Sequence, residues 1–177
     1  MPFRPVAKRF AGPDAEEIVG LLADLRAEVE RRRKLTVKQL EDASWIVLAW
    51  DEPHEAINPA LVGRQTAEKA RGYLETLATT SRDVKIRMVL ATQHFTSQDY
   101  STRTMGQLRH RVLLAVTSPT TASQMFGFIP TSFPSGKGNF LYRGAWTDDL
   151  VAGTTYDTQP WEVEAATQSM AVLLDND

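Results

Sequence analysis

Trp45-Ile-Val-Leu-Ala-Trp-Asp-Glu52 is the stretch of this sequence that decides the fold. Six apolar residues end abruptly in two adjacent carboxylates, and the run is too short to cross a membrane. Such a run is typical of a β-strand buried on both faces, as in a sheet covered by helices. Because burying a charge is costly, Asp51 and Glu52 are expected to emerge where the strand leaves the core. In open α/β sheets, ligands bind at that carboxyl end.

The bulk composition is that of one folded domain spanning residues 1–177. Hydrophobic residues make up 42% of the sequence and charged residues 24%, which excludes wholesale disorder. Lys and Arg number 20 against 22 Asp and Glu, and the net charge of −2 gives no overall attraction to nucleic acid. Any DNA contact must therefore come from local basic patches.

The same sequence disfavours several kinds of site and location. The absence of cysteine excludes a disulfide framework and a thiolate metal site, and three dispersed histidines fit a structural zinc site poorly. No apolar stretch approaches the roughly 18 residues that a membrane helix requires. Met1-Pro-Phe-Arg4 lacks the apolar region of a signal peptide, so we expect a cytoplasmic protein with no intrinsic membrane segment.

Apolar residues at helical spacing predict two main helices. The first starts at Pro13–Glu17, with Asp14 as N-cap and Glu17 at the capping-box position, and ends in the basic run Arg31–Lys34. Its apolar face is expected to contain Ile18, Leu21, Leu22, Leu25 and Val29. The second helix spans about residues 65–80, with Ala67, Ala70, Tyr73, Leu74 and Leu77 on one side.

Strand patterns recur between the helical ones, and together they predict an α/β fold with a largely parallel sheet flanked by helices. Pro53 is expected to stop regular structure after the acidic pair, and a looser polar stretch should follow Gln93 as far as Gly106. The other predicted elements are strands at 86–92, 111–117 and 138–142, a helical piece at 36–41, a short helix capped by Ser118 and Pro119 and ending at Gly127, and an amphipathic helix at 160–174.

Asp51 and Glu52 are the first candidate site. An Asp at this strand end can hold Mg²⁺ through water ligands, and the following Glu can polarise a water for attack on a γ-phosphate. The competing interpretation is an apolar strand that simply leaves the core at an acidic pair. A short motif of this kind does not decide between the two interpretations.

Gln93 and the arginines are the other candidates. Gln93 ends the next strand, where an amide could contact a γ-phosphate or its water, or could merely terminate the strand. Arg82 precedes that strand, whereas Arg109 and Arg111 flank the start of the third. Guanidinium groups near strand ends can contact phosphates of nucleotide or DNA, and surface ion pairs are the alternative.

Gly136-Lys-Gly138 imitates a phosphate loop but fails its pattern. The required glycine five residues before the Gly-Lys pair is Thr131, and Gly138 stands where Ser or Thr should follow the lysine. A turn into the next strand explains these glycines better. No other segment fits Gly-x-x-x-x-Gly-Lys-Ser/Thr, so the sequence shows no means of cradling β- and γ-phosphates.

Several segments, taken in order, resemble the second half of the motor domain of FtsK/SpoIIIE DNA-translocating ATPases, most closely the plasmid-transfer branch. The similarity covers about residues 20–143. The matching segments are Leu25–Arg32, which ends in an acidic-x-acidic-Arg-Arg pattern, Ile46–Glu52, which is similar to the Walker B strand, Ser81–Gln93, which ends in Ala-Thr-Gln, Gly106–Val116, and the glycine turn Gly136–Tyr142. The Ala-Thr-Gln strand after an Asp-Glu strand is the most specific part.

The resemblance implies a RecA-like core that forms a hexameric ring around double-stranded DNA. By the same resemblance, Asp51 would coordinate the Mg²⁺ of Mg-ATP, Glu52 would be the catalytic base and Gln93 a sensing amide. The family's Walker A loop lies upstream of the matched region, and this sequence contains no equivalent. Further departures are Thr121-Ala-Ser123 in place of an Asp-Ser-Arg, a shortened lead-in before Arg111, and Pro53-His54 after the acids.

Two functional hypotheses follow from these features. The first is part of an ATP-dependent DNA translocase for DNA transfer or segregation, inactive alone and dependent on Mg²⁺ and ATP only where a phosphate loop is supplied elsewhere. Its partners would be DNA and either identical copies or a full-length motor. The second is a non-catalytic accessory or remnant that binds a motor ring or DNA. Residues 144–177 lie outside the resemblance and form an extension in either case.

Overall fold

The computed structural model describes residues 11–93, 95–96, 99–114, 118–131, 133, 136, 138–145 and 149–155. The elements, in chain order, are α1 (Ala15–Arg32), α2 (Val37–Asp42), β1 (Ile46–Asp51), α3 (His54–Ile57), α4 (Pro59–Val62), α5 (Arg64–Thr80), the 3-10 turn η2 (Arg82–Val84), β2 (Ile86–Ala91), α6 (Thr102–Gln107), β3 (Arg111–Leu114), α7 (Pro119–Phe126), β4 (Asn139–Arg143) and β5 (Val151–Thr154). The helix predicted at 160–174 and strand residues 115–117 lie outside the described residues.

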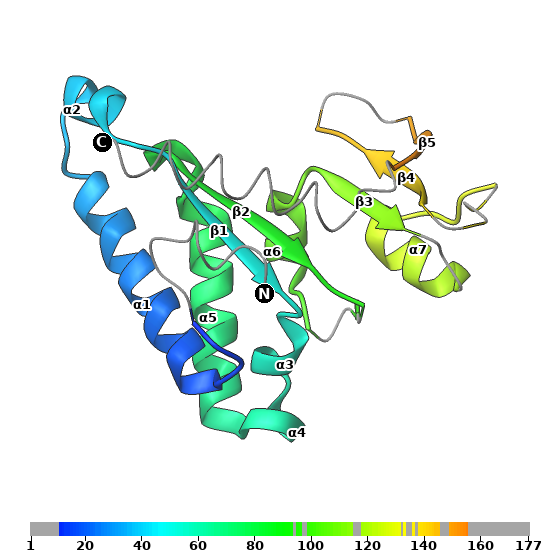
Figure 1. Cartoon of the computed structure of the whole chain (residues 1–177), viewed down its shortest axis with the longest axis horizontal. Helices are drawn as coiled ribbons and strands as arrows, with labels where there is room; N and C mark the ends of the chain where they lie inside the picture. The colour runs from blue at the N-terminus through cyan, green and yellow to red at the C-terminus, as the bar shows by residue number, and fades with distance from the viewer. Residues whose placement is uncertain are drawn as a thin grey trace, which may run out of the picture.

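β1 and β2 form a parallel pair in a register that begins with Ile46 opposite Ile86 and ends with Asp51 opposite Ala91. The crossover between them contains α5, which packs with α1 on one side of the pair (Figure 1). The main core lies at this junction and is built from Leu22, Val29, Leu48, Trp50, Leu74, Leu77 and Ile86, among others. The predicted apolar faces of the two long helices are thereby confirmed.

The second sheet is antiparallel, with strand order β3-β4-β5. Its inner face packs Leu113 and Leu141 against Ala122 and Phe126 of α7. The prediction of a largely parallel sheet was therefore wrong for this part of the described chain. A strand was missing from that prediction, because β5 (Val-Ala-Gly-Thr) is short and shows no clear alternation.

The expectation that the Trp45–Trp50 strand is buried on both faces was also wrong for the described residues. Leu48 and Trp50 are buried, whereas the alternate residues Val47, Ala49 and Asp51 are exposed, Val47 by 61%. β2 repeats this pattern, with Val89 58% exposed. The apolar run predicted a sheet covered on two sides, but the described helices cover one.

The N-terminus of α1 follows the sequence prediction with one difference. Asp14 accepts hydrogen bonds from the backbone N–H groups of Glu16 and Glu17, as an N-cap should. The Glu17 carboxylate does not reach back to Asp14, however, and instead accepts the N–H of Gly12 at 2.9 Å. At α7, Ser118 occupies the N-cap position without making a side-chain capping bond, and Gly127 ends the helix with φ +84°.

The basic end of α1 does more than face solvent. Arg32 is only 5% exposed, and its guanidinium donates to the Glu28 carboxylate at 2.7 Å and to the Val84 carbonyl at 3.1 Å. Hydrogen bonds from Arg31, and to a smaller extent from Arg32, lower the pKa of Glu28 to about 2 against the opposing effect of burial. Arg32 therefore fastens the end of α1 to the turn that leads into β2.

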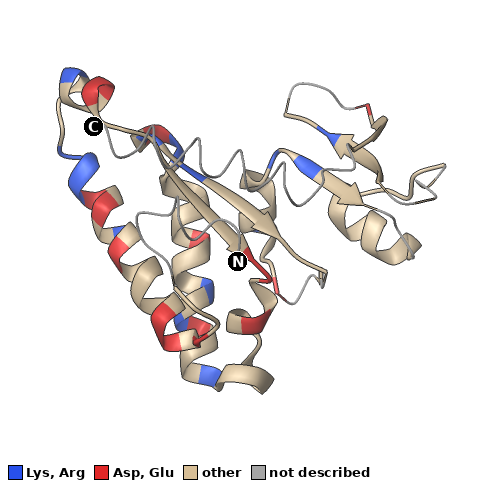
Figure 2. Ribbon diagram, viewed as in Figure 1, with Lys and Arg blue, Asp and Glu red and all other residues tan. Residues whose placement is uncertain are grey.

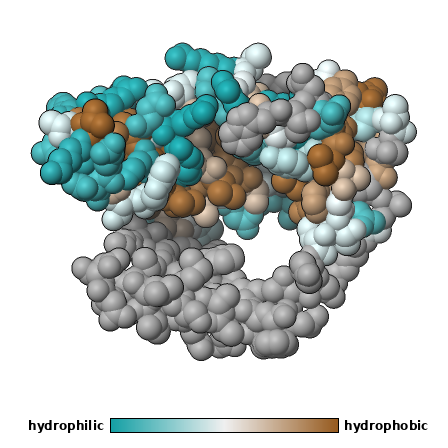
Figure 3. Space-filling view, turned by 90° about the horizontal axis from the view of Figure 1, so that it is seen from above, coloured by the Kyte–Doolittle hydropathy of each residue, from teal (hydrophilic) through white to brown (hydrophobic). Residues whose placement is uncertain are grey.

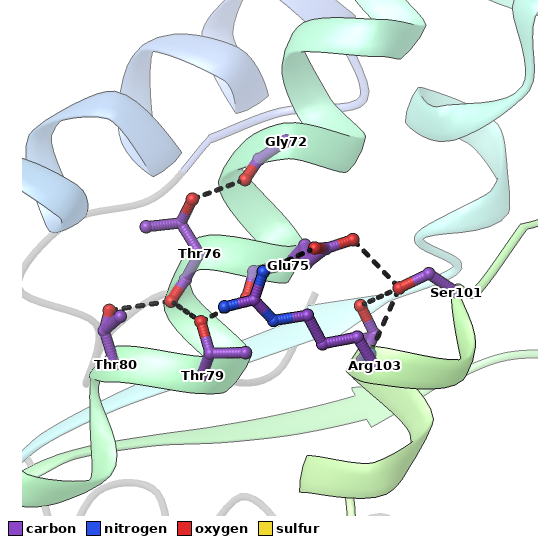
Figure 4. A network of polar contacts seen from close by, with 8 residues as sticks. Gly72, Glu75, Thr76, Thr79, Thr80, Ser101 and Arg103 are labelled. Atoms are coloured by element: carbon purple, nitrogen blue, oxygen red, sulfur yellow. Dashed lines mark hydrogen bonds and ion pairs between the residues drawn. The ribbon is translucent and has the colours of Figure 1, made fainter.

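Two local expectations change in the connecting segments. Pro53 is buried and ends β1, but helical structure resumes at once in α3 and α4. The polar stretch after Gln93 contains α6, whose N-cap Ser101 accepts the N–H of Thr104. Figure 4 shows how α6 is held: Ser101 donates to the Glu75 carboxylate at 2.9 Å, and Arg103 approaches the same carboxylate at 3.4 Å.

We predict that Arg32→Ala lowers the free energy of unfolding by about 2–3 kcal/mol, because it leaves a buried carbonyl unpaired and removes one partner of Glu28. Arg31→Ala is the control, since that side chain is exposed and its solvent-screened ion pair should contribute little. Urea denaturation followed by circular dichroism measures both changes. Equal losses in the two variants would show that Arg32 does not fasten α1 to β2.

Candidate functional site

The carboxyl ends of β1 and β2 bring three of the predicted site residues to one edge, which we call the acid edge (Asp51, Glu52, Thr92 and Gln93). The backbone N–H of Glu52 donates to the Ala91 carbonyl at 2.8 Å, which continues the parallel ladder past the end of β1. Gln93 follows two residues later. Figure 2 shows the acidic residues gathered where β1 meets α3. The sequence-based placement of Asp51, Glu52 and Gln93 at one edge is confirmed.

Glu52 has a backbone conformation that is unusual for a residue other than glycine. Its φ is +49°, in the left-handed region, which turns the chain sharply from β1 toward α3. One oxygen of its carboxylate accepts the backbone N–H of Gln93 at 2.8 Å, and the other accepts the Thr92 hydroxyl at 3.1 Å. Hydrogen bonds to a carboxylate are among the stronger ones in proteins. Glu52 therefore ties the end of β2 to the end of β1.

A second polar group lies just behind this turn and consists of His54, Asn58, Arg71, Thr96 and Asp99. Asp99 is 8% exposed, and its carboxylate accepts the Thr96 hydroxyl at 2.6 Å, lies 3.0 Å from Nδ1 of His54 and forms a longer ion pair with Arg71 at 3.7 Å. These contacts join α3, α5 and the segment after Gln93. Sequence analysis identified none of them, because the partners are up to 45 residues apart.

The hydrogen bonds of Asn58 define the role of each His54 nitrogen. The Asn58 oxygen must be the atom that accepts the Ala60 N–H at 2.9 Å, so its amide nitrogen faces Nε2 of His54 at 3.0 Å. An amide nitrogen can only donate, which makes Nε2 an acceptor and leaves Nδ1 to donate to Asp99. His54 thus acts as a bridge between the N-cap of α4 and the Asp99 carboxylate.

Tyr100 is a buried residue next to Asp99 in the same segment. Its ring is 3% exposed and stacks on Phe95, with 5.2 Å between ring centroids. Burial raises the pKa of the Tyr100 hydroxyl to about 12, and the carboxylates of Asp99 and Glu52 act in the same direction. A hydrogen bond from Thr92 acts in the opposite direction, but the phenol stays protonated over the ordinary pH range.

Asp51 is an exposed residue of the acid edge, as is Gln93. The Asp51 side chain is exposed and shares the uncovered face of β1 with Val47 and Ala49. Within the described residues, no group of three or more His, Cys, Asp or Glu side chains is close enough to hold a metal ion. A single exposed carboxylate suits Mg²⁺, which keeps several waters and is commonly completed by substrate phosphates.

The predicted arginines lie elsewhere. Arg82 is exposed and precedes the amino end of β2, so a strand of six residues, about 20 Å, separates it from Gln93. Arg109 is exposed just before β3. Arg111 is used internally: its guanidinium donates to the carbonyls of Leu108, Met105 and Met125, and burial lowers its pKa. The structure does not bring these three side chains to the acid edge.

The glycine turn predicted before β4 has the geometry of a turn. Gly136 and Gly138 have φ values of +95° and +82°, which disfavour residues with a Cβ. A Cβ at Gly138 would lie 3.0 Å from the Thr155 hydroxyl oxygen. Lys137 between them lies outside the described residues.

Among the described residues, no helix is both long and apolar enough to cross a membrane.

Comparison with known proteins places this fold. No protein-family model and no curated protein matches the sequence. The structure of the conjugation coupling protein TcpA of pCW3, a monomer form with ATPγS, superposes with a TM-score of 0.79 at 18% identity, covering 91% of this chain and 49% of that one. The cytoplasmic domain of the type VII secretion ATPase EccC of Thermomonospora curvata gives 0.55 at 15% identity, covering 82% of this chain and 17% of that one.

These similarities concern the fold alone, which is a mixed α/β fold like that of the matched parts of the TcpA and EccC structures. The chain spans about half of the length of the TcpA structure and a smaller part of the EccC domain. The acid edge lies at the carboxyl ends of the parallel strands, where α/β folds bind their ligands.

We predict that the Tyr100 phenol titrates with a midpoint of about 12. Because the pKa is raised in the folded state, the stabilisation from the neutral phenol is complete below pH 10 and is lost as the pH rises toward 12. Ultraviolet absorbance of the phenolate measures the titration, and Tyr100→Phe identifies the transition that belongs to this residue. If Tyr100 titrated near pH 10, its hydroxyl would not be buried as the structure describes.

Proposed function

We propose that this chain provides the magnesium-binding and water-activating side of an ATP-driven double-stranded DNA translocase of the FtsK/SpoIIIE type. The phosphate loop of that translocase would be supplied by a polypeptide segment outside this sequence. The observation that carries this proposal is the convergence of Asp51, Glu52 and Gln93 at one edge, joined by the 2.8 Å bond between Glu52 and the Gln93 N–H. Similarity to a coupling-protein structure solved with ATPγS supports the part of the proposal that concerns nucleotide binding.

Each residue at the acid edge fits a distinct part of that chemistry. Asp51 is exposed, so its carboxylate can bind Mg²⁺ through water. Bound Mg-ATP would supply the electrophilic phosphorus and the metal charge that offsets the developing negative charge. Glu52 would orient a water and accept its proton, and Gln93 would hold its side-chain amide toward the phosphate. The hydrogen bond from the Gln93 N–H to the Glu52 carboxylate fixes the distance between Glu52 and Gln93.

The phosphate loop determines whether the chain works alone. A phosphate cradle makes several charge-assisted hydrogen bonds of about 1.5–3 kcal/mol each. Five such contacts amount to roughly 10 kcal/mol, or about seven decades in affinity. No segment of the sequence has the phosphate-loop pattern. We therefore expect no useful ATP hydrolysis by this chain without a loop from elsewhere.

Contacts with DNA and with other subunits complete the proposal. Arg82 and Arg109 are exposed. Neither forms an ion pair with an acidic side chain among the described residues. They are our candidates for phosphate contacts with duplex DNA, which would weaken steeply as salt rises. The motor assembly would be a hexamer, or a ring that includes a full-length motor. Mg²⁺ and ATP would bind between its subunits, and the assembly would act in the cytoplasm.

A second function is favoured by the uncovered sheet face. Val47 and Val89 are exposed on β1 and β2, and an apolar face of this kind is suited to protein contacts. The chain could therefore act as a non-catalytic accessory that binds a motor ring. Pull-down with a full-length FtsK/SpoIIIE-like motor tests this function, because an accessory co-assembles whether or not Glu52 is intact.

We predict that the purified chain shows no ATP turnover above background, whereas a fusion of the full chain to the part of TcpA outside the structural match binds Mg-ATPγS. Fluorescent nucleotide titration measures the binding, and Asp51→Asn in the fusion should weaken it at least tenfold with Mg²⁺ but little without it. Asp42→Asn, an exposed acid on α2, is the matched control. ATP turnover by the chain alone that disappears in Glu52→Gln would refute the dependence on a loop supplied from outside.

A further inference from the structure

Two sets of hydrogen bonds join the chain after β1 to the chain after β2. In the first, which we call the Glu52 link, the Glu52 carboxylate accepts the Gln93 N–H at 2.8 Å and the Thr92 hydroxyl at 3.1 Å. In the second, which we call the His54 link, Nδ1 of His54 lies 3.0 Å from the Asp99 carboxylate and donates to it. Gln93 therefore lies between the end of β2 and a second point of attachment at Asp99.

The His54 link connects two parts of the chain that are fixed by burial. On one side, Ile57 of the same short helix α3 as His54 is fully buried in the main core. On the other side, Asp99 and Tyr100 are buried, and their backbone N–H groups donate to the Thr96 carbonyl at 3.1 and 3.3 Å. This link therefore does not depend on the acid edge for its own position.

The Glu52 link is the more accessible of the two. Glu52 is half-buried, and Gln93 is exposed. The proposed reaction turns the Glu52 carboxylate toward a water, and this exchange of partners opens the Glu52 link. The position of Gln93 then depends on what else holds the chain after β2.

Apolar packing over the acid edge does not supply that hold. Val89 is 58% exposed, and Ala91 at the end of β2 is also exposed. The space-filling view shows hydrophobic surface left open over the middle and one end of the described part (Figure 3). Among the described residues, polar contacts must therefore keep Gln93 in place.

We propose that His54 is a positioning residue for Gln93. Through Asp99, it holds the segment after β2, so that the Glu52 carboxylate can turn to a water without displacing the Gln93 amide. This inference rests on the proposed function, because only that reaction requires the Glu52 link to open. The resemblance did not supply this role, since Pro53-His54 is one of the departures from the family pattern.

The chemistry of the imidazole explains why a histidine suits this position. A neutral ring offers one donor and one acceptor, which here face Asp99 and the Asn58 amide nitrogen. Phenylalanine keeps a ring of similar size but has neither group. Asparagine lacks the ring but places an amide nitrogen near the position of Nδ1, where it can donate to Asp99. These two substitutions separate the hydrogen bond from the packing of the ring.

NMR relaxation of the Gln93 amide in the full chain, without nucleotide, tests the proposal. Glu52→Ala reproduces the open Glu52 link, and alanine has a Cβ like glutamate, so the left-handed backbone is no more strained. The order parameter of the Gln93 N–H should stay at about 0.8 in the parent chain and in Glu52→Ala. It should fall below about 0.6 in Glu52→Ala/His54→Phe and return to about 0.8 in Glu52→Ala/His54→Asn.

Three further measurements serve as controls. His54→Phe alone should leave Gln93 ordered, because the Glu52 link remains. Glu52→Ala/His110→Phe is the matched control, since it removes a histidine that contacts the Tyr142 hydroxyl, away from the acid edge, and Gln93 should stay ordered. In the parent chain at about pH 8, where an unperturbed imidazole is neutral, nitrogen–proton correlation spectra should show the His54 proton on Nδ1.

Several outcomes would overturn the role of His54. They are a disordered Gln93 in Glu52→Ala or in the His110→Phe control, an ordered Gln93 in Glu52→Ala/His54→Phe, or a proton on Nε2 of His54. Order with Phe and disorder with Asn at this position would assign the effect to packing instead. If the Phe double variant does not fold, the Asn double variant decides: an ordered Gln93 supports the proposal, and a disordered one refutes it.

Failure of this proposal is distinguishable from failure of the proposed function, because the relaxation measurement uses no nucleotide. If Gln93 behaves as expected but the fusion with the TcpA part does not bind Mg-ATPγS, the His54 link stands and the proposed function fails. If the fusion binds Mg-ATPγS but Gln93 does not respond to His54→Phe, only the role of His54 is wrong.

Discussion

The parallel ladder between β1 and β2 is the constraint on which the rest of the structure depends. Its register places Asp51 opposite Ala91 and continues through Glu52, so the acidic pair and Gln93 meet at one edge. The left-handed backbone of Glu52 turns the chain there, and its carboxylate holds the Gln93 N–H and the Thr92 hydroxyl. The ladder is thus the reason why residues 41 positions apart form one site.

Around this ladder, polar contacts between residues far apart in the sequence hold the helices and strands in position. Arg32 fastens α1 to the lead-in of β2, and Asp99 fastens the segment after Gln93 to His54. Arg111 fastens β3 to α6 and α7. Buried groups of this kind are costly unless fully paired, so they specify one arrangement of the elements rather than adding much stability.

The sequence predicted those parts of the structure that depend on local periodicity. The faces of α1 and α5 follow helical spacing, and the ends of β1 and β2 follow from apolar runs that stop at Asp51 and Gln93. Strand direction does not have a local signature, so the antiparallel β3-β4-β5 sheet was missed. Arg32, His54 and Asp99 were missed because their partners are set by the tertiary fold. Val47 looked like a core residue because hydrophobicity shows what a face can bury, not what covers it.

The role that we propose for Glu52 conflicts at first sight with its hydrogen bonds, since a carboxylate that binds backbone and hydroxyl donors is not available to a water. The magnitudes resolve the conflict. Exchanging its two charge-assisted bonds for water contacts costs at most about 3–6 kcal/mol, and much of that is returned by the new partners. The absent phosphate cradle is worth roughly 10 kcal/mol and nothing in the described chain replaces it. Under the proposed function, the limit on nucleotide chemistry therefore lies in the phosphate-binding element and not in the geometry of the acid edge.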